Sequence, residues 1–333
     1  MRNAYRHRAF PLITILLTVL VLFLCPGSPA GAENREYYHI VVLGDPHYPS
    51  KNEDPESDLR RKLIVQKLRL TEEVNSWADV DLVAVVGDIV AKSGSREDYR
   101  QAGEYISRLQ KPVAVIAGNH EFMYDDRQGP DGRYSRATPA VRQEKLLRFQ
   151  HTFGLGNLYY TQKMGHYFLV FLSPDVTDGN LLTELSSRQM AWLRQQLASH
   201  ANAPTIVFFH APLANTLLSY NAEVNTKQFI AQPENEISSI LKENPQVFLW
   251  VSGHTHTPAT NSSFRHPINL YQGQVLNIHC PDLDRGQVWT NSLYLYPDRV
   301  KVRTFNHTRG EWMSDLERTV SLPERLPVLP PKQ

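Results

Sequence analysis

Residues 38–47 read YHIVVLGDPH, an apolar run that stops at a glycine and is followed by aspartate and histidine. Four further apolar runs also end in polar residues: LVAVVGD at 82–88, VAVIAGNHE at 113–121, TIVFFH at 205–210 and VFLWVSGHTH at 247–256. Nearly continuous apolar runs of this length are typical of strands that are buried on both faces. Because open α/β sheets hold their ligands at the strand ends, we expect the five polar clusters to meet at one site.

Amphipathic segments separate these runs. Apolar residues at helical spacing predict helices over residues 58–77, 97–109, 142–153, 186–197 and 229–241. The alternation of strand and helix, with a further strand expected at 167–172, favours the α/β fold class. After residue 257 the pattern changes to strands with little helix between them, expected at 268–271, 274–278, 292–296 and 299–305.

Composition limits the class of protein. The chain has 333 residues, 41% of them hydrophobic, with 35 Lys+Arg against 34 Asp+Glu. These values are typical of a globular protein and exclude a disordered polyelectrolyte, a collagen-like fibre and a small disulfide-stapled domain. Residues 1–32 have the layout of a secretory signal peptide, with three arginines, an apolar run over 12–24 and a small-residue close at 30–32. We therefore expect one domain at 33–312, followed by a Pro-rich extended tail at 313–333.

The N-terminal segment predicts export, either to a periplasm or out of the cell. Its apolar run is shorter than the roughly 20 residues that span a bilayer, so cleavage after Ala32 is favoured over an uncleaved signal anchor. Membrane contact is expected only if that anchor is retained. Removal of residues 1–32 would leave a net charge of −2 and a single cysteine, Cys280. We therefore expect no internal disulfide and no basic surface for nucleic acid.

The five polar clusters share one ligand chemistry. They offer carboxylate, imidazole and amide groups without a thiolate, which suits Mn, Fe or Zn. A catalytic zinc usually takes three protein ligands and water, so this set is too large for one ion. Two ions that share a carboxylate fit better, and such pairs typically catalyse displacement at phosphorus. Asp45 with His47, and His254 with His256, are two residues apart, so on extended backbone each pair projects to one side.

The ordered motifs Asp-x-His, Gly-Asp, Gly-Asn-His-Glu, a lone His and Gly-His-x-His span residues 44–256. In this order they resemble the signature of the calcineurin-like metallophosphoesterase superfamily. The resemblance implies a four-layer αββα sandwich of two mixed sheets flanked by helices, in which the strands after residue 257 complete the second sheet. It also implies two divalent or mixed-valence metal ions that share Asp88.

The resemblance assigns roles to individual residues. It implies that one ion is bound by Asp45, His47, Asp88 and His256, and the other by Asp88, Asn119, His210 and His254. It further implies that a metal-bridging hydroxide attacks phosphorus while His120 assists the leaving group.

We therefore expect an exported phosphoesterase that hydrolyses a small-molecule or lipid phosphoester, with phosphodiesters favoured. A phosphomonoesterase or pyrophosphatase of the same superfamily is an alternative, as is a non-catalytic metal-binding protein on this fold. Loops at the strand ends should select the substrate. In the longest, 122–140, Arg127, Arg133 and Arg136 are candidate phosphate-binding residues; the alternative is a solvated loop whose charges face water.

Overall fold

The computed structural model describes residues 35–52 and 54–323. The signal peptide predicted at 1–32 and residues 324–333 of the predicted tail lie outside this range. Five α-helices are present in the described residues: α1 (Asp58–Ser76), α2 (Arg96–Ile106), α3 (Pro139–Phe153), α4 (Ser187–Ser199) and α5 (Glu234–Glu243). Four of the five have a Ser or Thr N-cap, whose side-chain oxygen accepts a hydrogen bond from a backbone N–H of the first turn.

The first sheet has seven strands, in the order β14-β13-β12-β1-β2-β3, with β15 also paired to β13. The strands are β1 (Tyr38–Leu43), β2 (Val80–Val86), β3 (Val113–Ile116), β12 (Trp289–Leu295), β13 (Arg299–Asn306), β14 (Glu311–Trp312) and β15 (Arg318–Ser321). β1, β2 and β3 run parallel to one another, whereas β12 is antiparallel to β1. The sheet is therefore mixed, as predicted.

The second sheet has six strands, in the order β10-β11-β9-β8-β7-β6. The strands are β6 (Tyr160–Met164), β7 (Tyr167–Phe171), β8 (Thr205–Phe208), β9 (Val247–Ser252), β10 (Leu270–Tyr271) and β11 (Val275–His279). The central four run parallel, and β6 and β10 are antiparallel edge strands. This sheet is also mixed.

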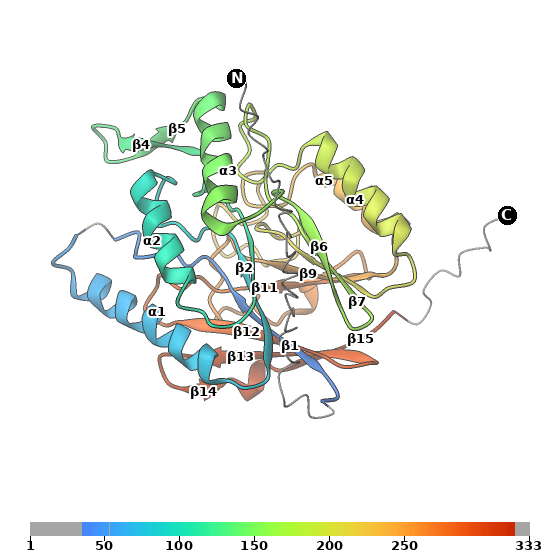
Figure 1. The fold of residues 1–333 in the computed structure, drawn as a ribbon. Coiled ribbons are helices and arrows are strands. Elements are labelled where there is room, and N and C mark those ends of the chain that lie inside the picture. The colour runs from blue at the N-terminus through green and yellow to red at the C-terminus, as the bar shows by residue number, and fades with distance from the viewer. Residues whose placement is uncertain (1–34, 53, 324–333) are drawn as a thin grey trace, which may run out of the picture. The chain divides into compact units, whose positions relative to one another are not determined.

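Hydrophobic contacts join the sheets and helices into four layers (Figure 1). Along β1, Val41 and Leu43 pack towards α1, α2 and α3, while Ile40 and Val42 pack against the second sheet. On the far side of the second sheet, α4 and α5 cover β7, β8 and β9, with Trp250 at the centre. Both faces of each sheet are thus buried, which explains the continuous apolar runs in the sequence. The predicted αββα sandwich is confirmed.

The structure corrects the prediction for the strands after residue 257. Of the strands described after residue 257, only β10 and β11 join the second sheet, while β12 pairs with β1 and β13 pairs with β12. Residues 314–321, assigned to the tail from their sequence, form a short 3₁₀ helix (Ser314–Leu316) and β15. The sequence of a strand does not determine which other strand it pairs with, because pairing depends on which sheet edge is left open by the rest of the chain.

Two other expectations differ from the structure. α5 begins at Glu234 rather than at residue 229, because the residue before Pro233 is restricted to extended backbone. The loop expected at 122–140 contains an antiparallel hairpin of β4 (Tyr124–Gln128) and β5 (Tyr134–Arg136). Its strands are polar and mostly exposed, so they lack the apolar alternation by which a strand is recognised in a sequence.

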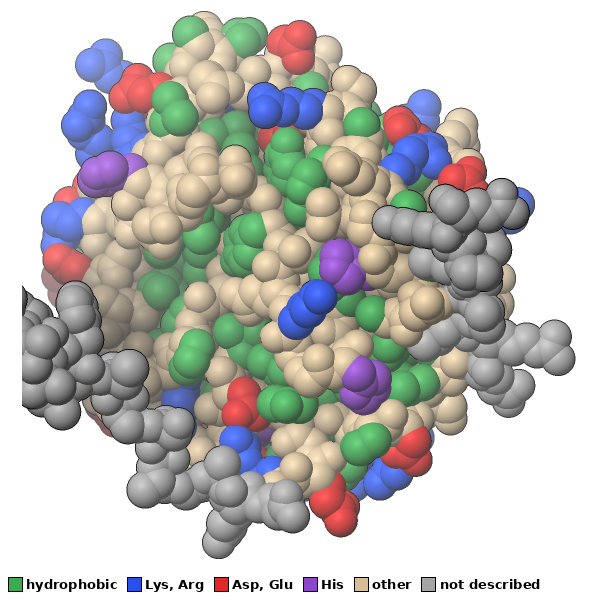
Figure 2. Space-filling view, turned by 45° about the vertical axis from the view of Figure 1, so that its right-hand side comes forward, with side chains coloured by type: hydrophobic (Ala, Val, Ile, Leu, Met, Phe, Trp, Pro, Cys, Tyr) green, Lys and Arg blue, Asp and Glu red, His purple; other side chains and the backbone are tan. Residues whose placement is uncertain are grey.

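The face shown in Figure 2 carries side chains of both charges. On the face shown in Figure 2, acidic and basic side chains lie next to one another along the rim, with apolar side chains between them. None of the helices within residues 35–52 and 54–323 combines the length and the apolar character of a transmembrane span.

Candidate metal centre

The candidate ligands lie in loops that follow strands of both sheets. Asp45 and His47 follow β1, Asp88 follows β2 and Asn119 follows β3. His210 follows β8, and His254 and His256 follow β9. Because parallel strands end at the same edge of a sheet, these loops converge at one edge of the sandwich.

The backbone at this edge is left-handed at five candidate ligands. The φ angles are 44° at Asp45, 41° at His47, 50° at Asp88, 67° at His254 and 50° at His256. Non-glycine residues adopt such angles at a cost of about 1–3 kcal/mol each, and they cluster at functional sites. The expectation of extended backbone within the two His-containing pairs is therefore wrong, because each of these four residues has a left-handed backbone conformation.

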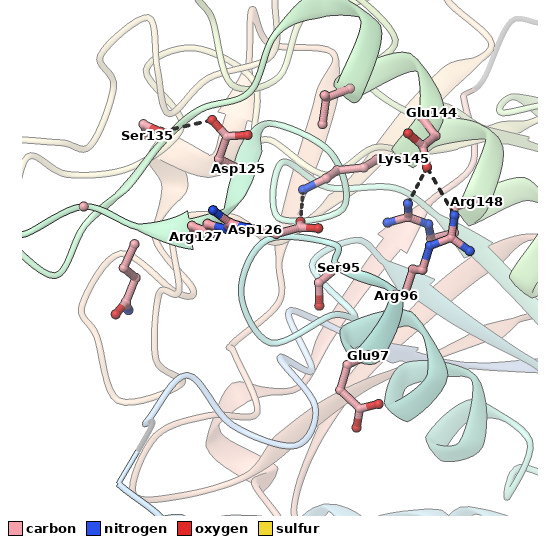
Figure 3. Close-up of a pocket in the computed structure, with 13 residues that line it drawn as sticks. Ser95, Arg96, Glu97, Asp125, Asp126, Arg127, Ser135, Glu144, Lys145 and Arg148 are labelled. Carbon is pink, nitrogen blue, oxygen red and sulfur yellow. Dashed lines mark hydrogen bonds and ion pairs between the residues drawn. The ribbon is translucent and has the colours of Figure 1, made fainter.

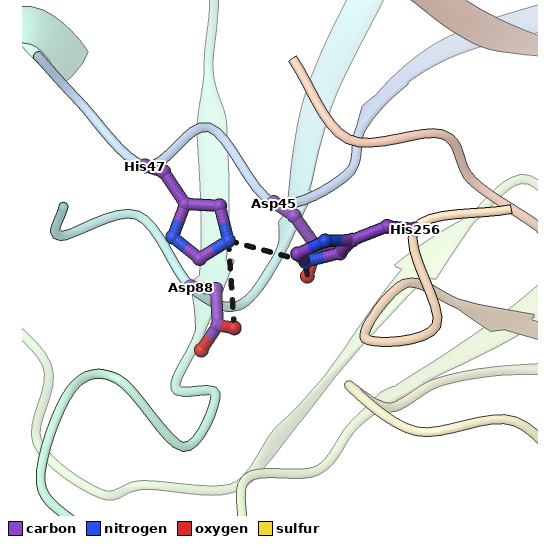
Figure 4. A group of neighbouring side chains, drawn as sticks. All are labelled: Asp45, His47, Asp88 and His256. Carbon is purple, nitrogen blue, oxygen red and sulfur yellow. Dashed lines mark hydrogen bonds and ion pairs between the residues drawn. The ribbon is translucent and has the colours of Figure 1, made fainter. Parts of the chain in front are cut away.

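One group of four side chains is formed by Asp45, His47, Asp88 and His256 (Figure 4). Each offers an oxygen or nitrogen atom, and these atoms all lie within 4.8 Å of one another. The Nε2 atoms of His47 and His256 are 3.2 Å apart, and His256 Nε2 is 3.2 Å from Asp45 Oδ1. Asp88 Oδ2 lies 3.7 Å from His47 Nε2. The donor atoms thus converge on one point.

A second group, Asp88, His210 and His254, shares Asp88 with the first. His210 Nε2 lies 3.3 Å from Asp88 Oδ2 and 3.2 Å from Asn119 Oδ1. The Asn119 amide oxygen is therefore placed to complete this group. Asp88 is positioned between both groups, which is the place that the resemblance assigns to a bridging ligand.

Outer oxygen atoms orient the two imidazoles of the first group. His47 Nδ1 is 3.3 Å from the Val90 carbonyl, and His256 Nδ1 is 3.3 Å from Asp282 Oδ2. Each ring therefore turns its Nε2 towards the other ligands of the group, and the two Nε2 atoms lie 3.2 Å apart. Outer partners such as Asp282 also fix the ring orientation of metal-binding histidines.

Backbone carbonyls orient the two imidazoles of the second group. His210 Nδ1 is 2.8 Å from the Val86 carbonyl, which leaves Nε2 facing Asp88. His254 uses the opposite nitrogen, because its Nε2 is 2.9 Å from the Gln228 carbonyl. Sequence reasoning missed these outer partners, since backbone carbonyls have no sequence signature.

Two motif glycines leave room for the ligands of a neighbouring loop. A Cβ on Gly253 would overlap the Asp45 carboxylate, which accepts hydrogen bonds from the backbone N–H of His254 at 3.0 Å. A Cβ on Gly118 would overlap Asp88 Oδ1. The glycines are therefore required by the close approach of two loops.

Glu121 joins two of the ligand loops. Its carboxylate is fully buried and accepts hydrogen bonds from four backbone N–H groups. Oε2 accepts from Asp88 at 2.9 Å and Gly118 at 2.6 Å, and Oε1 accepts from Ile89 at 2.7 Å and Val90 at 3.0 Å. Glu121 thereby holds the loop after β2 against the loop after β3. Sequence reasoning assigned it no role, although its place in the Gly-Asn-His-Glu motif was a signal.

Burial and the Asp88 carboxylate set the protonation of three histidines at the site. Burial lowers the pKa of His254 to about 3 and that of His120 to about 4, so both imidazoles are neutral at pH 7. Burial also disfavours a charge on His210, but the adjacent Asp88 carboxylate raises its pKa to about 9. Although burial opposes it, the positive charge of His210 lowers the pKa of Asp88 well below its usual value.

A cavity of about 220 Å³ opens over both groups. His120 lies in its wall, and its Nδ1 contacts the Lys92 carbonyl. Tyr124 OH accepts a hydrogen bond of 3.3 Å from Asn119 Nδ2, which turns the amide oxygen towards His210. Sequence reasoning also missed four further residues of this wall: Lys51, Leu182, Phe229 and Arg285.

The three candidate arginines of the β4–β5 hairpin lie outside the cavity over the metal-ligand groups. Arg127 lines a larger cavity of about 890 Å³ formed by α2, α3 and the β4–β5 hairpin (Figure 3), where Lys145 pairs with Asp126. Arg133 is exposed in the hairpin turn, and the guanidinium of Arg136 lies 5.4 Å from the Tyr124 ring centre. The substrate-binding role of these arginines stays a prediction.

The fold and the paired ligand groups define a metal-dependent phosphoesterase. The family model for calcineurin-like phosphoesterases matches residues 38–258, and the chain belongs to this family. It is therefore a hydrolase, and its curated relatives include named phosphodiesterases.

Two curated relatives illustrate the similarity. The chain is 21% identical over 253 residues to a probable cyclic nucleotide phosphodiesterase from Moraxella catarrhalis, covering 76% of this chain and 81% of the relative. It is 27% identical over 181 residues to a glycerophosphodiester phosphodiesterase from Enterobacter lignolyticus, covering 53% of this chain and 56% of that protein.

Solved structures show the same fold at low sequence identity. A dimetal phosphatase from Danio rerio superposes with a TM-score of 0.56 at 16% identity, covering 86% of this chain and 100% of that one. A purple acid phosphatase from yellow lupin gives a TM-score of 0.57 at 14% identity, covering 86% of this chain and 54% of that one.

Proposed function

We propose that this protein hydrolyses a phosphodiester of a small molecule or lipid at a centre of two metal ions. The observation that carries the proposal is the position of Asp88, whose Oδ2 lies 3.7 Å from His47 Nε2 and 3.3 Å from His210 Nε2. One carboxylate thus belongs to two ligand groups. The first ion would be held by Asp45, His47, Asp88 and His256, and the second by Asp88, Asn119, His210 and His254.

In the proposed reaction, the residues around the cavity have separate roles. When bound, a metal pair supplies positive charge to the phosphate and acidifies water at the site. His120 is held through Nδ1 by the Lys92 carbonyl, so Nε2 is the ring atom left for the reaction. The negative charge of a bound phosphate would raise the pKa of His120, and Nε2 would then carry the proton that the leaving oxygen takes up. Tyr124 holds the Asn119 amide through a hydrogen bond. The His254 ring stacks on the Phe229 ring, with ring centres 4.9 Å apart.

Two observations favour a diester over a monoester. Relatives of this chain are named as cyclic nucleotide and glycerophosphodiester phosphodiesterases. The cavity wall also includes Tyr124, Leu182 and Phe229, which offer apolar surface to an ester group beside the phosphate. A diester carries two such groups and a monoester only one, so a diester can cover more of this surface.

Two substitutions test the proposal with bis(4-nitrophenyl) phosphate as substrate. Asp88→Asn should abolish hydrolysis and lower the bound metal, because it weakens both ligand groups at once. The His120→Ala protein should keep its metal, and its kcat should fall by about 10²- to 10⁴-fold, which is the usual contribution of a positioned acid or base. His151→Ala, an exposed histidine of α3, is the matched control and should match the wild type.

The assay also separates the alternatives. Full activity in the Asp88→Asn protein would refute the proposed centre. Faster turnover of 4-nitrophenyl phosphate or pyrophosphate than of the diester would favour a monoesterase or a pyrophosphatase. A protein that binds metal but hydrolyses none of these esters would be a binding protein on an enzyme fold.

Export is the second part of the proposal, and it rests on residues 1–32 alone. Mass spectrometry of the protein from its native host should find Glu33 as the first residue. An intact N-terminus in a membrane fraction would support the signal anchor instead.

A further inference from the structure

Two cationic side chains line the cavity but belong to none of the metal-ligand motifs. Lys51 lies in the loop after β1, and Arg285 lies in the segment between β11 and β12. Lys51 Nζ is 3.2 Å from His47 Nε2, and Arg285 Nη2 is 3.4 Å from His256 Nδ1. Both cations therefore lie beside imidazoles of the same ligand group.

The guanidinium of Arg285 is held in place by a buried acid. Its Nε donates a 3.0 Å hydrogen bond to Asp282 Oδ2, and the Asp282 side chain is only 4% exposed. Asp282 also faces His256 Nδ1 at 3.3 Å. The backbone next to it is anchored as well, because the Leu283 N–H donates to the Asp45 carbonyl at 3.2 Å. Arg285 is thus fixed relative to the metal-ligand group.

A second buried pair fixes the loop that carries Lys51. Lys67 is fully buried in α1 and donates to Asp284 Oδ1 at 2.6 Å and to the Pro49 carbonyl at 3.0 Å. Asp284 Oδ2 accepts a 2.7 Å hydrogen bond from the backbone N–H of Lys51. The segments that bear the two cations are therefore tied to each other through Asp284.

We propose that Arg285, with Lys51 as a second cation, binds the non-bridging phosphate oxygens of the substrate. A guanidinium forms short, charge-assisted hydrogen bonds with phosphate, and Arg285 is held with its outer N–H groups at the cavity. A metal ion on His47 Nε2 would take the lone pair that Lys51 now contacts, and a phosphate oxygen offers the ammonium a new acceptor.

This inference rests on the proposed function and adds a rule for substrate choice. Arg285 and Lys51 recognise the phosphate rather than the alcohol attached to it. Their loss should therefore weaken the binding of different phosphodiesters by a similar factor. This expectation separates a phosphate-binding pair from residues that recognise one particular ester group.

The first measurement is calorimetric titration of inorganic phosphate into the Mn²⁺-saturated full-length protein, which does not depend on turnover. Arg285→Met should weaken phosphate binding about 5- to 20-fold, as expected for the loss of a partly exposed charge-assisted contact, and Arg285→Lys should recover part of the loss. Arg309→Met removes an arginine of similar exposure that pairs with Glu311, and it should leave the affinity unchanged. Glu223→Gln removes an acid from the cavity wall and should not weaken binding.

The second measurement compares KM for bis(4-nitrophenyl) phosphate and for glycerophosphocholine. Arg285→Met should raise both KM values by a similar factor with little change in kcat, which is the signature of lost uniform binding. Unchanged phosphate affinity at equal metal content would overturn the inference, as would a KM effect on only one ester. Absence of turnover by the wild type would refute the proposed function, and the phosphate titration would still test Arg285.

Discussion

Replacing Glu121 with glutamine should separate the two ligand loops while hardly changing the volume of the side chain. Each carboxylate oxygen of Glu121 accepts two backbone N–H groups, those of Asp88 and Gly118 on Oε2 and those of Ile89 and Val90 on Oε1. A glutamine has one acceptor oxygen, so its NH₂ group must face two N–H donors. Whichever way the amide turns, two of the four hydrogen bonds are lost.

The size of the effect follows from these contacts. Burial and the neighbouring Asp88 carboxylate raise the pKa of Glu121 to about 7, so stability is compared at about pH 8.5, where the group is ionised. A hydrogen bond to a charged acceptor contributes about 1.5–3 kcal/mol, so the loss of two should then lower the free energy of unfolding by about 3–6 kcal/mol. No reduction for solvent screening applies, because Glu121 is 0% exposed. Movement of the loops after β2 and β3 also displaces Asp88 and Asn119, so we expect weaker metal binding as well.

Urea denaturation of the metal-free protein, followed by tryptophan fluorescence, measures the free energy of unfolding. Metal content after dialysis reports on the site. Glu144→Gln is the matched control, because Glu144 is exposed on α3 and contacts Arg148; its effect should stay within about 0.5 kcal/mol. A change of less than about 1 kcal/mol for Glu121→Gln, with normal metal content, would refute the reasoning.

Two further predictions concern buried neighbours of the site. Lys67→Met should lower the free energy of unfolding, measured by urea denaturation, by about 3–5 kcal/mol, because Asp284 loses its buried partner. The double variant Lys67→Met with Asp284→Leu should recover much of that loss, because it leaves no unpaired buried charge. Equal stability of the single and double variants would contradict this account. Gly253→Ala should reduce the amount of bound metal, because the new Cβ displaces the Asp45 carboxylate. Elemental analysis measures the metal content, and a normal value would show that the loop can shift without loss of metal binding.

The parts of the site that could be predicted from sequence are local ones. Asp45, Asp88 and His254 each follow a buried strand directly, and strand ends of an α/β sheet meet at one edge. Their residue types then limit the metal chemistry. The α/β class and the buried strands also followed from local patterns, since a strand buried on both faces is apolar throughout, whereas the four-layer arrangement came from the family resemblance.

Other parts of the structure had no local signal. β12 pairs with β1 across more than two hundred residues of chain, and its sequence does not specify that partner. Asp282 and Arg285 reach the site only because their segment docks against the loop after β1. The polar β4–β5 hairpin was missed because its exposed strands lack an apolar alternation.

The amino-acid sequence by itself determined the candidate ligand atoms and their order along the chain, because donor chemistry belongs to the residue type. It also determined which runs form the buried strands. Only the tertiary structure decided that Asp88 lies between both ligand groups, that Glu121 ties two loops together and that Lys51 and Arg285 flank the cavity. These relations depend on distances between segments far apart in sequence, and such distances are set by packing of the two sheets.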